Sequence, residues 1–202
     1  MSKNREIEAK VALNQESYEQ IAAAYPVKAD FQQKNTYFDT PDELLKVHHN
    51  ALRIRTFKDR AEETIKVPEA KKLQEKYHES LEINDDLTCE EAESYLAKGQ
   101  VYLGGYVGSF LKENYPSDVD KLRSFTWSQT HRLLLNGPLD CEITLDQTSY
   151  PDGFSDYEME IENDDPSLIK DCLAQLKDRF KLEIATTNNM SKIARASLHA
   201  GN

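Results

Sequence analysis

The segment EIEAKV, residues 6–11, alternates charged and apolar side chains near the start of this 202-residue chain. Successive side chains of a β-strand point to opposite faces, so Glu6, Glu8 and Lys10 share one face and the apolar residues share the other. Such alternation predicts a strand with one polar face and one apolar face.

Four later segments alternate in the same way, and their charges are sorted by sign. They are ALRIRTF (51–57) with Arg53 and Arg55, ETIKVP (63–68) with Lys66, DCEITLD (140–146) with Asp146, and DYEMEIE (156–162) with Glu158, Glu160 and Glu162. Like charges on one strand face repel, so a purely structural surface would tend to mix the signs. Because carboxylates suit hard cations and arginines suit phosphate, the sorted charges favour a ligand that contains both metal and phosphate.

Strands dominate the expected secondary structure and do not alternate regularly with helices. Strands are expected at 4–12, 34–39, 51–58, 62–67, 73–83, 122–127, 130–136, 140–146 and 155–163, and helices at 15–25, 88–98, from 166 onward and 191–199, with a broken helix within 100–120. This order favours an α+β fold with an antiparallel sheet. The polar face either faces solvent, as in an ordinary sheet, or lines the inside of a sheet closed into a barrel.

Composition narrows the class of protein. The net charge of −11 argues against a nucleic acid or an anionic membrane as a partner, although a local basic pocket could still hold a small phosphate. Three separated cysteines without a CxxC pair argue against a disulfide framework or a zinc site and favour a reducing compartment. No signal peptide or membrane-length apolar run is present, which predicts a cytoplasmic protein. No linker interrupts the chain, so residues 1–202 are expected to form one domain, and the oligomeric state is not predicted.

A series of short motifs follows in a set order along the chain. They are EIEAK (6–10), NTYFDTP (35–41), LRIR (52–55), TIKVP (64–68), THR (130–132), LD (145–146), EME (158–160) and SK (191–192). Together they resemble the CYTH superfamily of triphosphate tunnel metalloenzymes, which includes class IV adenylyl cyclases and thiamine triphosphatases, in its stand-alone bacterial form. The resemblance implies a closed eight-stranded antiparallel β tunnel with a polar lumen and helices packed on the outside.

The resemblance also implies a site that binds a triphosphate substrate together with Mg²⁺ or Mn²⁺. The implied metal ligands are Glu6, Glu8, Glu79, Asp146, Glu158 and Glu160, and the implied substrate-binding residues are Lys10, Arg53, Arg55, Lys66, Arg132 and Lys192. Glu79 is preferred to Glu75 and Glu82 because it lies just before the loop that leads to the helix at 88. Without a ligand, the acids are expected to repel one another in a poorly screened lumen.

The expected reaction is hydrolysis of inorganic tripolyphosphate, thiamine triphosphate or a nucleoside triphosphate with release of phosphate. Glu6 and Glu8 are expected to orient or deprotonate the attacking water, and Lys66 to stabilise the leaving phosphate. The chain has no GxxxxGK[ST] motif, so a P-loop is excluded as the phosphate binder. Two alternatives remain open: an adenylyl cyclase that makes cyclic AMP, and a phosphate- or polyphosphate-binding module without turnover.

Overall fold

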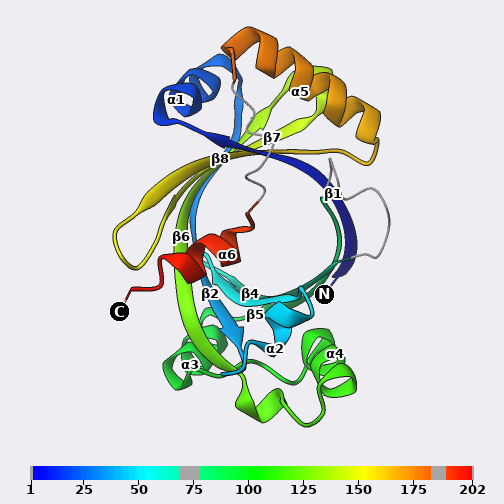
Figure 1. The fold of residues 1–202 in the computed structure, drawn as a ribbon, viewed down its shortest axis with the longest axis vertical. Helices are drawn as coiled ribbons and strands as arrows, with labels where there is room; N and C mark the ends of the chain where they lie inside the picture. Colours follow the sequence, from blue (N-terminus) through cyan, green and yellow to red (C-terminus); the bar gives the residue numbers. More distant parts are fainter. Residues whose placement is uncertain (1, 69–77, 183–189, 202) are drawn as a thin grey trace.

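Eight antiparallel strands form the centre of the molecule (Figure 1). The computed structural model describes residues 2–68, 78–182 and 190–201. The strands are β1 (Ser2–Leu13), β2 (Val27–Asp39), β3 (Ala51–Thr56), β4 (Ala61–Pro68), β5 (His78–Leu87), β6 (Arg123–Asn136), β7 (Glu142–Ser149) and β8 (Ser155–Glu162). They pair in the order β1-β5-β4-β3-β2-β6-β7-β8, and β8 pairs with β1, so the hydrogen-bonded sheet closes on itself as a barrel.

The strand register sorts polar and apolar residues onto the two faces of this sheet. Lys10 lies opposite Glu160, while the neighbouring Val11 lies opposite Met159. Residues opposite one another in antiparallel strands lie on the same face, so charged residues meet on the inner face and apolar residues on the outer face. The α+β class with eight antiparallel strands is therefore confirmed.

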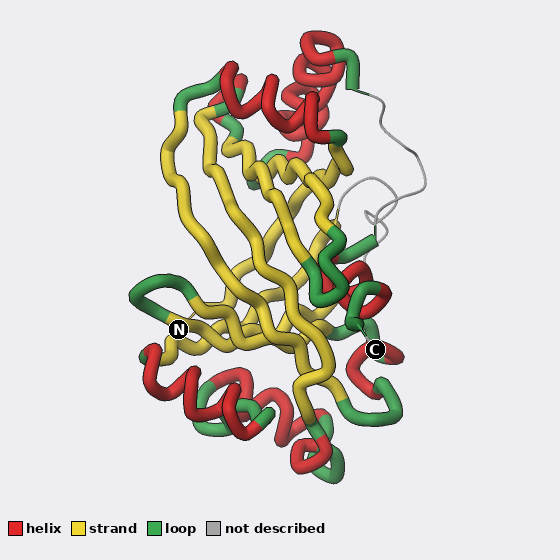
Figure 2. The backbone as a smooth tube through the Cα atoms, turned by 90° about the vertical axis from the view of Figure 1, so that its left-hand side faces the viewer, coloured by secondary structure: helices red, strands yellow, loops and turns green. Residues whose placement is uncertain are grey.

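The helices cover the outer face on two opposite sides of the strands (Figures 1 and 2). They are α1 (Gln15–Ala24), α2 (Leu44–Val47), α3 (Cys89–Lys98), α4 (Tyr106–Asn114), α5 (Pro166–Phe180) and α6 (Lys192–Leu198), with 3₁₀ turns η1 (Val119–Lys121) and η2 (Pro138–Asp140). Helices α1 and α5 pack on β1 and β6–β8, and α3 and α4 pack on β3–β5, which gives two separate apolar cores outside the sheet. Helix α6 instead lies across one mouth of the barrel and contacts β6. None of the helices within the described ranges has the length and apolarity needed to cross a bilayer.

Local sequence signals account for the helix ends. Thr88 and Glu91 form a capping box at the start of α3, which ends at Gly99 with a φ of 60°. Asp165 accepts a hydrogen bond from the Ser167 amide at 2.8 Å and caps α5. Ser191 caps α6 by accepting from the Ala194 amide at 3.3 Å. The helices predicted at 15–25, 88–98 and 191–199 are found within a residue or two of their expected ends, and α5 begins at the expected residue 166.

The bounds of several predicted strands need correction. The segments expected at 122–127 and 130–136 are one strand, β6, because Thr126, Ser128 and Thr130 continue its polar inner face. Strand β2 begins at Val27 rather than 34, where its exposed first half gives no clear apolar alternation. Strand β5 runs to Leu87, beyond the expected end at 83, and residues 69–77 lie outside the described residues.

A pair of buried acids supports the packing of the segment before α4. Glu63 is fully buried on the outer face of β4, opposite Asp85 on β5. Its Oε1 accepts a hydrogen bond from the Tyr102 amide at 2.8 Å. Asp85 accepts from the amides of Tyr106 and Val107 at the start of α4. Burial raises the pKa of Glu63 to about 8, outweighing the opposite effect of the Tyr102 amide, and the charge of Asp85 adds to the rise.

Glu63→Gln is expected to stabilise the protein above neutral pH. The pKa of Glu63 is higher in the folded state than in the unfolded chain, so its contribution to stability is complete below about pH 4.5 and is lost as the pH rises through about 8. Glutamine stays neutral and can still accept from Tyr102. Urea unfolding at pH 5, 6.5 and 8.5 should show the wild type losing a few kcal/mol more than the variant as the pH rises, on the order expected for a shifted buried acid. Parallel pH profiles for the two proteins would contradict this account.

Candidate active site

The inner face of β6, β7 and β8 carries a cluster of acids already paired with bases, which we name the β7–β8 cluster. Its acids are Asp146, Glu158 and Glu160, and its bases are Lys10, Arg132 and Lys192. The strand register explains why these residues lie together. Asp146 on β7 lies opposite Glu158 on β8 and opposite Arg132 on β6, so the three side chains share the inner face. Asp146 and Glu160 are almost completely buried.

Lys192 is the point where the three acids meet. Its Nζ lies 2.8 Å from Asp146 Oδ2 and 2.8 Å from Glu160 Oε1, and it also pairs with Glu158. Burial by itself would lower the pKa of Lys192, but the three carboxylates raise it well above its ordinary value. The sequence-based expectation of mutually repelling acids is therefore wrong for these three, since a buried ammonium group lies among them.

Arg132 is committed to the same acids. Its Nε and Nη2 donate to the two carboxylate oxygens of Asp146 at 2.8 and 2.6 Å, and Nη2 also donates to Glu160 at 3.1 Å. Such a two-pronged arrangement is the strongest geometry that arginine offers. Although burial opposes it, the charges of Lys192 and Arg132 lower the pKa of Asp146. Arg132 thus holds the acids in position, a role different from the phosphate binding expected from sequence.

Helix α6 supplies a second basic side chain, Arg195, that sequence reasoning missed. Arg195 Nη1 donates to Glu158 Oε2 at 2.8 Å, and Nε donates to the Tyr150 hydroxyl at 3.0 Å and lies 2.7 Å from Asp156 Oδ2. Its spacing from Lys192 could have predicted this role. Residues three apart on a helix share a face, and Lys192 was already expected to be functional.

The opposite wall of the barrel carries Arg53 and Arg55 on β3, which we name the arginine wall. In the ring of eight strands, β3 and β8 lie four strands apart in both directions. Arg55 Nε donates to Asn35 Oδ1 at 2.8 Å, and its Nη1 donates to Glu62 at 3.1 Å. Arg53 comes only within 3.6 Å of Glu82. The arginine wall is thus less completely neutralised than the β7–β8 cluster.

The electrostatics of Arg55 support this difference. Burial, together with the charges of Arg53 and Arg132, lowers the pKa of Arg55 to about 10, and the charges of Glu62 and Glu82 offset only part of this shift. Burial and the charge of Arg53 thus make the charged form of Arg55 less favourable than it would be in water. An anion at this wall would restore the balance.

Three buried N–H donors lie on the same part of the inner face. Within the described part of the chain, Gln33 Nε2, Asn35 Nδ2 and Arg53 Nε have no hydrogen-bond acceptor. Buried donors are normally satisfied, so these groups call for an acceptor from water or from a ligand. Asn35 and Gln33 were not expected from sequence, although they lie in phase with Tyr37 on β2.

Glu8, Lys10 and Lys66 connect the two walls. Glu8 is buried, and its Oε1 lies 3.0 Å from Lys10 Nζ and 3.4 Å from Lys66 Nζ. Lys10 also donates to Glu160 at 2.9 Å, and Lys66 lies 3.4 Å from Glu82. Although burial would lower the pKa of Lys10, Glu160 and Glu8 raise it.

Two residues of the expected metal set need separate treatment. The side chains of Glu6 and Glu79 lie outside the described part of the structure, so the role of Glu6 stays a prediction. The register pairs Glu79 with Ile7, whose side chain packs in the outer core, and pairs Glu82 with Lys66. The preference for Glu79 over Glu82 is therefore corrected. The alternation of the apolar residues Leu81 and Ile83 with Ser80 and Glu82 correctly indicates that Glu82 lies on the inner face.

Among the acids whose side chains the structure describes, two groups could hold a divalent cation. Carboxylate oxygens of Asp146, Glu158 and Glu160 lie within 4.8 Å of one another, as do those of Glu8, Glu160 and Glu162. Oxygen-only sets of this kind fit Mg²⁺ or Mn²⁺, which prefer carboxylates over nitrogen or sulfur ligands.

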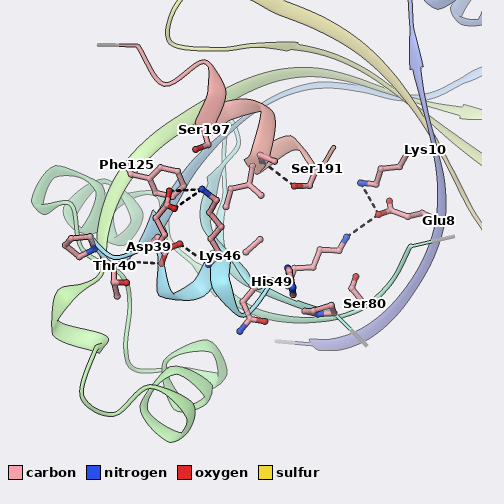
Figure 3. Close-up of a pocket in the computed structure, with 18 residues that line it drawn as sticks. Glu8, Lys10, Asp39, Thr40, Lys46, His49, Ser80, Phe125, Ser191 and Ser197 are labelled. Carbon is pink, nitrogen blue, oxygen red and sulfur yellow. Dashed lines mark hydrogen bonds and ion pairs between the residues drawn. The ribbon is translucent and has the colours of Figure 1, made fainter. Parts of the chain in front are cut away.

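A cavity of about 590 Å³ opens at the mouth of the barrel beside α2 and α6 (Figure 3). Its inner end is lined by Glu8, Lys10 and Lys66, and it reaches outward to Phe125 and the residues around α2. The cavity therefore joins the charged lumen to the surface.

Comparison with known sequences identifies relatives of the chain. The sequence model of the CYTH domain matches residues 4–194. YjbK of Bacillus subtilis (strain 168), named as a candidate triphosphatase, is 39% identical over 87 residues, which are 42% of this chain and 46% of YjbK. The chain thus matches less than half the length of that relative.

Two solved structures share the fold. A candidate adenylate cyclase of Bacillus halodurans superposes with a TM-score of 0.81 at 25% identity, over 96% of this chain and 98% of that one. HpAC1 of Hippeastrum, described as a candidate adenylyl cyclase with a dominant triphosphatase activity, superposes with a TM-score of 0.80 at 20% identity, over 95% and 94% of the two chains. At 20% identity the second likeness shows the fold alone.

Proposed function

Because the chain belongs to the CYTH family, whose domain model matches residues 4–194, we propose that it is a divalent-metal-dependent triphosphatase. The substrate is a small-molecule triphosphate that lies in the lumen of the barrel, used as a polar tunnel. One observation carries the proposal: the arginine wall is less completely neutralised than the β7–β8 cluster and has unsatisfied donors, and it lies opposite the acids of that cluster. The name of YjbK supports the same chemistry.

The proposal assigns the phosphate oxygens to the least neutralised bases. Arg53 and Arg55 bind the chain of phosphates, and Gln33 and Asn35 donate to it through their unsatisfied amides. Lys66, within 3.4 Å of Glu8 and Glu82, offsets charge on the leaving phosphate. Lys10 and Lys192 contact both acids and substrate, while Arg132 and Arg195 hold the acids.

Mg²⁺ or Mn²⁺ would be held by Asp146, Glu158 and Glu160, with Glu8 at the edge of the set. When bound, the cation supplies positive charge that offsets the charge of the phosphate oxygens. Glu8, buried beside two lysines, orients the attacking water as a hydrogen-bond acceptor, and Glu6 assists from the same strand face. The water oxygen bonds to the terminal phosphorus as the anhydride bond breaks, the bond electrons go to the diphosphate that leaves, and the proton of the water passes through Glu8 to solvent.

A substrate panel tests the proposal. The purified protein is incubated with inorganic tripolyphosphate, thiamine triphosphate and ATP in Mg²⁺ or Mn²⁺, and orthophosphate, pyrophosphate and cyclic AMP are measured separately. We expect orthophosphate from at least one triphosphate and no cyclic AMP. Cyclic AMP with equimolar pyrophosphate from ATP would replace the proposal with a cyclase. Tight binding without any product would replace it with a binding module.

A further inference from the structure

The mouth cavity changes character along its length. At its inner end, Glu8, Lys10 and Lys66 belong to the charged lumen. At its outer end, the cavity is lined by Pro41, Phe125, Ile193 and Ala194, and 41% of the Phe125 surface is exposed. Exposed aromatic and aliphatic side chains gain little from a phosphate chain, but they bind an apolar or aromatic ligand well.

The charged groups at the outer end are already committed to the protein. Lys46 donates to Glu43 at 2.8 Å, so these two charges neutralise one another. The carboxylate of Asp39 accepts from the amides of Thr40, Leu45 and Lys46 at 2.7, 2.8 and 3.1 Å. The Asp39 bonds fix the turn into α2, and among the described residues at the outer end no lysine or arginine is left unpaired for phosphate.

We propose that this outer part of the cavity binds a planar heteroaromatic group joined to the triphosphate, so that the substrate is an organic triphosphate rather than inorganic tripolyphosphate. The inference rests on the proposed function, because it places the triphosphate in the lumen. A volume of about 590 Å³ lies within the range of small-molecule sites and leaves room for a ring system beyond the phosphates. Phe125 provides the face on which the ring packs.

Helix α6 connects the two halves of such a ligand. Lys192 and Arg195 reach into the β7–β8 cluster, whereas Ile193, Ala194 and Ser197 line the cavity. One short helix therefore contacts the expected positions of both the phosphates and the ring. In Figure 3, Ser191 and Ser197 mark the course of this helix along the cavity.

The test is a selectivity ratio. kcat/KM is measured in Mg²⁺ for ATP, for thiamine triphosphate and for inorganic tripolyphosphate, with the wild type, Phe125→Ala and the control Tyr106→Ala. Tyr106 is exposed at the start of α4 and does not line the cavity. We expect the wild type to prefer one organic triphosphate, and the ATP and thiamine triphosphate arms identify which ring it takes. Phe125→Ala should lower the ratio of organic to inorganic kcat/KM about tenfold, the effect of losing one aromatic contact, while Tyr106→Ala leaves the ratio unchanged.

The outcomes separate this inference from the proposed function. The inference is overturned if Phe125→Ala leaves the ratio of organic to inorganic kcat/KM unchanged, or if the wild type prefers tripolyphosphate. In either case, hydrolysis of tripolyphosphate still supports the proposed triphosphatase activity. If no triphosphate is turned over, the proposed function fails, and calorimetric affinities of the same three compounds give the same ratio for binding alone. Circular dichroism of each variant confirms that the fold is intact.

Discussion

Glu160→Gln should lower kcat/KM for triphosphate hydrolysis by on the order of a thousandfold, and it should also lower the melting temperature of the metal-free protein. Glu160 contacts Lys10, Arg132 and Lys192, and the charges of these three bases, opposed by burial, hold its pKa well below the ordinary range. Glutamine keeps the size of the side chain but removes the charge that balances the bases. Leaving a buried charge without its partner costs about 3–5 kcal/mol.

Glu142→Gln is the matched control for this substitution. Glu142 is the first residue of β7 and pairs with Lys28, and the side chains of Lys28 and Glu142 are 57% and 33% exposed. An exposed pair contributes about 0–1 kcal/mol, so this variant should keep its activity and its melting temperature. Thermal melts with and without Mn²⁺ complete the measurement: the wild type and Glu142→Gln should be stabilised by the metal, and Glu160→Gln should not. A Glu160→Gln protein with wild-type kinetics would remove the β7–β8 cluster from the mechanism.

Arg55→Ala should lower the activity but leave the stability of the protein almost unchanged, unlike Glu160→Gln, which should lower both. We expect kcat/KM to fall about 100- to 1000-fold, as for the loss of one donor that stabilises developing charge. The melting temperature should change little, because the lowered pKa of Arg55, caused by burial and by Arg53 and Arg132, shows that its charge is unfavourable in the ligand-free fold. Arg53→Ala should behave in the same way.

The control for the arginine wall is Arg60→Ala. Arg60 packs over the ring of Phe57 and is largely exposed, on the same hairpin as Arg55. Steady-state kinetics should show no effect of this change on the triphosphatase reaction. If Arg53→Ala and Arg55→Ala both fold and retain wild-type KM and kcat, the arginine wall does not bind the substrate.

Much of the inner face could be predicted because a strand has only two faces. Once Leu52 and Ile54 are taken as buried, Arg53 and Arg55 must point the other way, and the register confirms this. The same parity places Glu158 and Glu160 together. Parity fails only where the starting residue is wrongly chosen, as happened when Glu79 was preferred over Glu82.

The partners of these side chains could not be predicted from parity. Strand alternation gives the face of a residue but not its distance from residues on other elements. The contact of Lys192 with three acids depends on where α6 lies across the barrel mouth, and α6 is set by tertiary packing around Tyr37 and Tyr150. The mouth cavity likewise depends on α2, a single turn too short to leave a helical period in the sequence.

The closure of the barrel by its first and last strands has a consequence for folding during synthesis. Lys10 and Glu160 are 150 positions apart, and β1 and β8 pair directly. Pairing of distant segments must overcome the entropy of closing the long loop between them, so contacts of this kind form slowly. While the chain is made, β1 has an unpaired edge until β8 has left the ribosome, and exposed strand edges promote association with other chains. The ion pair between Lys10 and Glu160 therefore forms only when β8 has paired with β1. The β7–β8 cluster is thus complete only after the barrel has closed.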